Sequence, residues 1–147
     1  MLTLDQLLER LEKVRGGVGR TRRWVGDVPE ARRTTVAAAI AREVGYDPPE
    51  GALLPISRAQ AGLGLSFLGA SELSSTSPSR PREGLVTLAR QAFSDLAGGA
   101  EFFANGDWGE AWRTPRFAFR NISDSRIDGG VLGYDAHKAF IFWVEED

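Results

Sequence analysis

Apolar residues recur at three- and four-residue steps in three segments of the chain, which predicts three amphipathic helices. The first spans about residues 3–15, where Thr3 and Gln6 have the spacing of a capping box. The second is expected over about residues 27–44 and the third over about residues 81–96. Each of these helices would have one apolar face to pack against another element.

Other segments alternate between apolar and polar positions, which is typical of β-strands. We expect short strands at residues 53–56 and 62–68 and a longer one at residues 116–122, in which Phe117 and Phe119 share a face. Trp24 and Val25 are expected to begin a short strand or to pack a basic loop against the protein.

The clearest strand pattern closes the chain. Residues 130–144 are rich in β-branched and aromatic residues on both sides of a short polar turn, which predicts a β-hairpin. In the expected register, Gly130 lies opposite Trp143 and Gly133 opposite Phe140, so that each ring covers a bare backbone. The second arm is apolar on both faces, and we therefore place it inside the sheet.

These elements predict a single α+β domain over residues 1–147, with about three helices packed on an antiparallel sheet and the C-terminal hairpin at its centre. The Ser-rich residues 71–80 are expected to form a mobile loop. The longest apolar run, residues 36–41, is too short to cross a membrane, and the first residues do not have the order of a secretory signal. We therefore expect a cytoplasmic protein with no membrane partner.

Charge is distributed unevenly along the chain. Residues 1–42 contain nine basic and five acidic residues, net +4, and residues 43–147 contain nine and fifteen, net −6, which together give the formal net charge of −2. Such a division indicates either two surfaces of opposite sign or two surfaces that attract each other on folding. Nearly all basic residues are arginines, which indicates a GC-rich genome, and the absence of cysteine excludes disulfides and thiolate chemistry.

An aromatic cluster at residues 102–116 is the first candidate binding surface. Tryptophan and arginine often anchor protein interfaces, although the same rings can simply complete a core, which would leave Trp108 or Trp112 the more exposed. Together with acidic residues that follow it, the predicted interface consists of Trp108, Trp112, Arg113, Arg116, Asp124 and Asp128.

A basic tract at residues 15–33 is the second candidate. Its arginines could neutralise phosphates while an indole stacks on a base, so an anion- or nucleic-acid-binding role is the alternative function. The residues predicted to do this are Arg20, Arg22, Arg23 and Trp24. A sequence pI near 5.5 and the absence of a known reader motif favour the simpler explanation that these arginines pair with the acidic remainder of the chain.

Catalytic chemistry has little support in the sequence. His137 is the only histidine and lies beside Asp135 at the hairpin tip, so a small hydrolase-like enzyme around these two residues is a further alternative. Asp124, Asp128 and Asp135 have the spacing of part of a calcium loop, but Arg126 stands where a ligand oxygen is required. The acidic residues at the chain end are expected only to keep it solvated.

We therefore expect no catalytic residues, no metal and no cofactor, and a binding role rather than catalysis. The leading hypothesis is a non-enzymatic protein-binding module, such as a small bacterial inhibitor or immunity protein. Its acidic C-terminal part would suit a basic partner, for instance a toxin or nuclease domain whose site it occludes.

Overall fold

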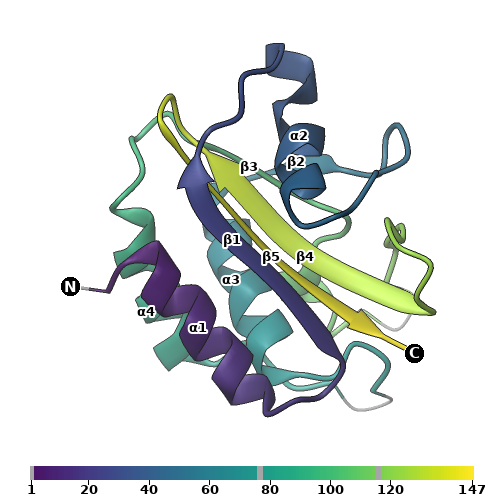
Figure 1. Ribbon diagram of the computed structural model, residues 1–147. Coiled ribbons are helices and arrows are strands. Elements are labelled where there is room, and N and C mark those ends of the chain that lie inside the picture. The colour runs from purple at the N-terminus through teal and green to yellow at the C-terminus, as the bar shows by residue number, and fades with distance from the viewer. Residues whose placement is uncertain (1, 76–77, 115–116) are drawn as a thin grey trace.

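The computed structural model describes residues 2–75, 78–114 and 117–147. An antiparallel sheet of five strands separates two layers of helices, with α1, α3 and α4 on one face and α2 on the other (Figure 1). The helices are α1 (Leu4–Arg15), α2 (Val36–Glu43), α3 (Arg58–Ala70) and α4 (Glu83–Phe93), with 3-10 turns η1 (Arg33–Thr35) and η2 (Trp108–Glu110). The strands, in spatial order, are β1 (Arg20–Asp27), β5 (Lys138–Glu146), β4 (Ile127–Tyr134), β3 (Glu101–Ala104) and β2 (Leu54–Ile56).

The predicted α+β class is confirmed, and so is the C-terminal hairpin. β4 and β5 pair with Gly130 opposite Trp143 and Gly133 opposite Phe140. β5 lies between β1 and β4 and is buried along almost its whole length, as a strand with apolar residues on both faces requires. The hairpin therefore forms the middle of the sheet.

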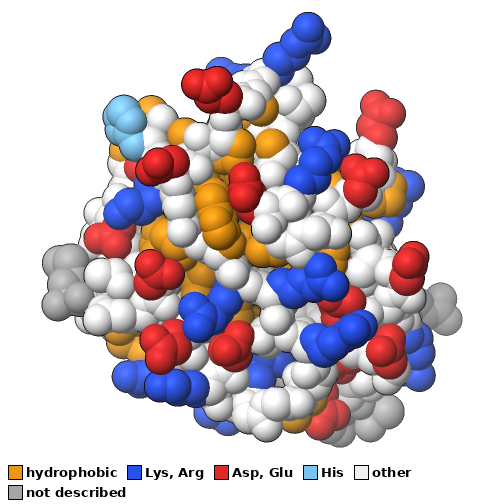
Figure 2. Space-filling view, in the orientation of Figure 1, with side chains coloured by type: hydrophobic (Ala, Val, Ile, Leu, Met, Phe, Trp, Pro, Cys, Tyr) orange, Lys and Arg blue, Asp and Glu red, His pale blue; other side chains and the backbone are white. Residues whose placement is uncertain are grey.

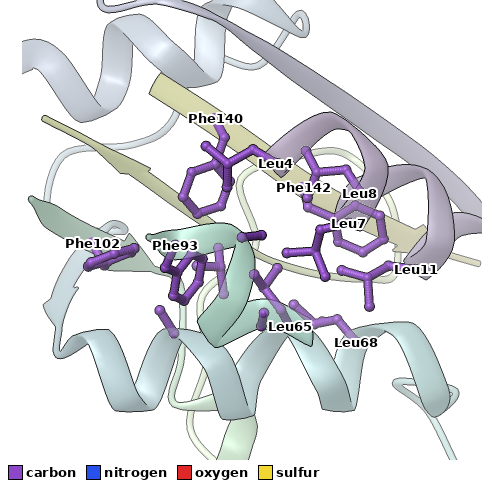
Figure 3. Close-up of a cluster of buried hydrophobic side chains, with 14 of the residues drawn as sticks. Leu4, Leu7, Leu8, Leu11, Leu65, Leu68, Phe93, Phe102, Phe140 and Phe142 are labelled. Carbon is purple, nitrogen blue, oxygen red and sulfur yellow. The ribbon is translucent and has the colours of Figure 1, made fainter. Parts of the chain in front are cut away.

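The first helix also begins as predicted. Gln6 N donates to Thr3 Oγ1 at 3.2 Å and Thr3 N donates to Gln6 Oε1 at 3.0 Å, which completes the capping box. Its apolar stripe packs with α3, α4 and β5 into the larger core (Figure 3). The residues labelled in that view are Leu4, Leu7, Leu8, Leu11, Leu65, Leu68, Phe93, Phe102, Phe140 and Phe142. A smaller core, between the sheet and α2, contains Ile40, Leu132, Ile141 and Trp143.

The strand predicted at residues 62–68 is wrong, because this segment is the middle of α3. Ser57 and Gln60 form a second capping box that starts the helix. The alternation of apolar residues is misleading because most of the helix is buried, so its small residues also face neighbours, as Gly69 does against Leu11. α3 is the additional helix, one more than the three expected.

Two further elements differ from prediction, one strand and the start of one helix. Residues 117–122 form no strand: the described part of the segment makes a single bridge, between Phe119 and Gly106, and Arg116 lies outside the described residues. The second helix begins only at η1, because β1 continues to Asp27 and its ladder with β5 is extended by a hydrogen bond from Val28 N to the His137 carbonyl at 2.9 Å. No helix in the described part of the chain is long and apolar enough to span a bilayer.

Candidate binding surface

A groove with mainly apolar walls lies beside the end of the sheet where β4 begins. It has a volume of about 580 Å³ and runs between the segment after α3 and the segment after η2. The apolar residues that line it include Phe67, Leu73, Pro78, Trp112, Phe117 and Phe119. Phe119 is among the few large apolar side chains that are exposed, at 38% of its surface.

Trp108 forms the floor of this groove. The side chain is 2% exposed, and its ring centroid lies 4.7 Å from that of Phe117 and 5.5 Å from that of Phe119. Its Nε1 donates to Asn105 Oδ1 at 2.8 Å, which satisfies the indole N–H inside the protein. The ring also lies directly on the β4 backbone at Gly129, where any β-carbon would overlap it.

A buried carboxylate, on the face of the sheet opposite the groove, fixes the loop that precedes β4. Asp128 is fully buried and accepts hydrogen bonds from the backbone N–H groups of Ile122 and Ser123, at 3.0 and 2.8 Å, and from the Ser123 hydroxyl at 2.6 Å. Trp143 Nε1 and Asn105 Nδ2 donate to its other oxygen, each at 3.1 Å. Asp128 thus ties the loop before β4 to the sheet, together with the bonds from Asn105 Nδ2 to the Arg120 carbonyl and from Ser125 Oγ to Glu145.

Trp112 forms the outer rim and is flanked by arginines. The guanidinium carbon of Arg80 lies 4.9 Å from the centroid of its ring and that of Arg113 lies 5.6 Å away, both within cation–π range. Arg113 also pairs with Glu110, with Nη2 2.7 Å from Oε1, and this hydrogen bond lowers the pKa of the Glu110 carboxyl. A second hollow, of about 540 Å³, lies against the same Trp112 and Arg113.

The structure brings together only part of the predicted interface. Trp112 and Arg113 are neighbours on this rim, as expected. Trp108 and Asp128 are buried with their polar atoms satisfied internally, which corrects their prediction as contact residues: Trp108 lies beneath the groove, and Asp128 faces the side of the sheet that α2 covers. Asp124 is exposed but lines a different hollow, on the side of the sheet that α2 covers. Arg116, also predicted there, falls outside the described residues.

Phe117, Phe119 and Arg80 belong to the site but were absent from the predicted interface. The alternation of Phe117 and Phe119 placed both rings on one face, and both indeed contact Trp108. For Arg80, inside the Ser-rich loop, the sequence carries no comparable signal.

The hollow beside Asp124 has a volume of about 470 Å³ and a buried glutamate in its wall. Glu145 accepts hydrogen bonds from Ser125 Oγ at 2.7 Å and Tyr46 Oη at 2.8 Å, and it pairs with Arg22 at 3.1 Å and Arg20 at 3.3 Å. Burial opposes ionisation of Glu145, but these hydroxyls and arginines together lower its pKa. Burial and the bond to Glu145 raise the pKa of Tyr46. The expectation that the acidic chain end is merely solvated is thus wrong.

Arginines from the basic tract at residues 15–33 are also engaged inside the molecule. Arg15 is buried, with Nη2 2.7 Å from a carboxylate oxygen of Glu146, and Arg23 Nε lies 3.4 Å from Glu12. These pairs join the basic first part of the chain to carboxylates of the same protein. The pairs of Arg15 with Glu146 and of Arg20 and Arg22 with Glu145 fit the explanation that the basic first part attracts the acidic remainder on folding, whereas the pair of Arg23 with Glu12 lies within the first part.

Asp135 and His137 do not have the arrangement of a catalytic pair. The Asp135 carboxylate accepts from the backbone N–H groups of Ala97, His137 and Lys138, at 2.9, 2.8 and 2.7 Å. Partial burial raises its pKa, but the three N–H groups outweigh that effect and the pKa is lowered. The carboxylate therefore caps the hairpin turn, and no hydrogen bond between it and the exposed imidazole is found among the described residues.

The residues with calcium-loop spacing do not converge either. Asp128 lies near the start of β4 and Asp135 just beyond its end, so the length of a strand separates them. Within the part of the chain that the structure describes, no group of three or more acidic, histidine or cysteine side chains is placed to hold a metal ion.

Comparison with known proteins finds no matching family model, no matching curated protein and no matching solved structure.

Proposed function

We propose that this chain is a non-enzymatic protein-binding module whose partner contacts the aromatic groove and the adjoining Trp112. The observation that carries the proposal is the apolar groove with the partly exposed Phe119 on its wall and an arginine-flanked tryptophan on its rim. Tryptophan and arginine dominate the energetic centres of protein interfaces, and contiguous apolar surface on a protein commonly marks such a site.

The rigidity of the surface supports this role. The floor of the groove is fixed by the bond between Trp108 and Asn105, and Asn105 in turn donates to Asp128 at the start of β4. A surface that is ordered before binding loses less conformational entropy when the partner arrives. Full burial of a phenylalanine contributes about 1.5–3 kcal/mol, so covering the exposed part of Phe119 alone would contribute about 1 kcal/mol.

The charges beside the groove indicate the chemistry of the partner. Arg80 and Arg90 line the second hollow, and neither has a carboxylate partner in the described residues. A segment that inserts an apolar side chain and places Asp or Glu next to Trp112 would suit this rim. The argument for a basic partner is weaker, because Glu145 and Glu146 of the acidic part are paired internally. Occlusion of a partner's site, as by an inhibitor or immunity protein, would be one outcome of such binding.

A peptide selection tests both the surface and the charge of the partner. Peptides displayed on phage are selected on the intact protein, and each enriched peptide is then titrated against Phe119→Asp, which places a charge on the groove wall. We expect enriched peptides to carry an aromatic or aliphatic residue flanked by Asp or Glu. They should bind Phe119→Asp at least tenfold more weakly, because the apolar contribution of Phe119 is lost and the new carboxylate repels the acidic residues of the peptide.

Leu54→Asp is the matched control, because Leu54 is 54% exposed and lies on β2, outside the lining of the groove. Peptides that bind both variants equally well would refute the groove as the binding surface. Enrichment of Lys- and Arg-rich peptides would support a basic partner instead. A parallel pull-down with and without nuclease separates protein partners from nucleic acid, and loss of all bound material after nuclease would favour the nucleic-acid alternative.

A further inference from the structure

β1 leaves one long edge of the sheet without a neighbour. It pairs with β5 in unbroken register over its eight residues, from Arg20 opposite Glu145 to Asp27 opposite Lys138, and contains no proline. Its other side forms no ladder with any described strand. Figure 2, in the orientation of Figure 1, shows hydrophobic side chains along this edge with charges of both signs around them. Long regular edges of this kind are templates for pairing with another strand.

The backbone groups that point outward can be identified. Hydrogen bonds alternate along an antiparallel pair, and the bond from Val28 N to the His137 carbonyl continues the β1–β5 ladder by one step. Even-numbered residues of β1 therefore bond to β5, and odd-numbered residues turn their N–H and C=O groups away from the sheet. These outward-facing residues are Thr21, Arg23, Val25 and Asp27.

The arginines of β1 do not protect this edge by simple repulsion. Arg20 and Arg22 pair with Glu145 on the face of the sheet that α2 covers, and Arg23 pairs with Glu12 on the other face. Their charge is thus largely balanced within each molecule. We propose that β1 pairs antiparallel with β1 of a second copy of this chain, which joins two five-stranded sheets into one.

Symmetry and the outward groups limit the register. An antiparallel pair about a two-fold axis must place outward-facing residues opposite one another, and two registers do so while keeping nearly the whole strand paired. One places Arg23 opposite Arg23 of the second copy, which sets like charges directly against each other. The other places Trp24 opposite Trp24, in a pair without mutual hydrogen bonds, where side chains approach most closely. The geometry favours the register centred on Trp24.

The state of Trp24 in the single chain fits this arrangement. The indole is partly exposed, and it lies along its own strand over Gly26, where a β-carbon would overlap the ring. The ring is therefore only partly covered in the single chain. Pairing across the two-fold axis would cover more of it.

Sedimentation over a range of protein concentrations tests the pairing. As the protein concentration rises, we expect the apparent mass of the native chain to increase from that of a monomer to that of a dimer. Arg23→Pro should remain a monomer, because proline removes an outward N–H without removing a bond to β5. Arg23→Ala is the matched control: it loses the same ion pair with Glu12 but keeps the N–H, and it should still dimerise. Far-UV circular dichroism verifies that each variant is folded. A native chain that stays monomeric throughout refutes the proposal.

Cysteine substitution then tests the register, since the chain contains no cysteine of its own. In a pair without mutual hydrogen bonds the Cα atoms lie about 4.5 Å apart, which a disulfide can span. Trp24→Cys should therefore form a covalent dimer under mild oxidation, whereas Arg23→Cys and Leu54→Cys should not. A covalent dimer from Arg23→Cys in place of Trp24→Cys would overturn the register centred on Trp24.

Discussion

Replacement of Asp128 by asparagine is the sharpest test of how the loop before β4 is held. The substitution preserves the shape of the side chain but changes one of its two oxygens into an N–H donor. In the native protein one oxygen accepts from Asn105 and Trp143, each at 3.1 Å, and the other accepts from the backbone N–H and the hydroxyl of Ser123 at 2.8 and 2.6 Å. Either orientation of the new amide therefore points donors at donors.

The cost follows from counting the donors that lose their acceptor. With the amide nitrogen toward Ser123, the hydroxyl can rotate and accept, but the backbone N–H is left unsatisfied. With the opposite orientation, the Trp143 N–H is left unsatisfied, whereas Asn105 Nδ2 keeps its bonds to the Arg120 and Asp128 carbonyls. A buried donor without a partner costs about 1–3 kcal/mol. Asp128→Asn should therefore reduce the free energy of unfolding by about 1–3 kcal/mol, a substantial share of the 5–15 kcal/mol typical of a domain.

Urea unfolding, followed by circular dichroism, measures this loss as a lower midpoint at an unchanged m-value. Asp124→Asn is the control, because Asp124 is exposed and carries the same chemistry four positions away. It should change the free energy of unfolding by less than about 0.5 kcal/mol. An equally small effect of Asp128→Asn would show that the hydrogen bonds of this carboxylate do not hold the loop.

Three further predictions concern the sheet. The pKa of Glu145 is lowered in the folded protein, so its contribution to stability is present above the ordinary value of 4.5 and is lost as the pH falls through the folded pKa; unfolding measured from pH 6 to 3 should show this, with a shallower decline for Glu145→Gln. Gly130→Ala should destabilise the protein by more than about 2 kcal/mol, because the new β-carbon would overlap the ring of Trp143, whereas Gly84→Ala, in open space on α4, should be neutral or slightly stabilising in the same urea assay. His137→Ala should leave the thermal midpoint of unfolding within about 1 °C of the native value, because the imidazole is exposed and the turn is held by bonds from backbone N–H groups to the Asp135 carboxylate. A drop of several degrees would contradict this explanation.

The hairpin and the first helix could be predicted because their signals are local. Gly130 and Trp143 face each other across a two-residue turn, and Thr3 and Gln6 are three positions apart, so sequence spacing alone defines the contact. The same kind of signal was present in Ser57 and Gln60, which cap α3. It was outweighed by an alternation of apolar residues that a buried helix can also produce.

The binding surface could be predicted only in part, because burial depends on contacts between distant segments. The local sequence does not show which of Trp108 and Trp112 is buried. Trp108 is buried because its indole donates to Asn105 and its ring fits into the space left by Gly129 on β4. Likewise, β1 was expected as at most a short strand, because arginines obscure its alternation. Its strand character depends on β5, more than a hundred residues away.

The pairing of β1 with β5 has a consequence for how the chain is made. Arg20 and Glu145 are 125 positions apart, so this ladder closes one of the longest loops that the chain can form. During synthesis β1 emerges before β5. Until β5 has emerged, neither edge of β1 is paired with a strand. Refolding should accordingly be slow for a protein of this size, and nascent or partly folded molecules should be most prone to aggregate through this early strand.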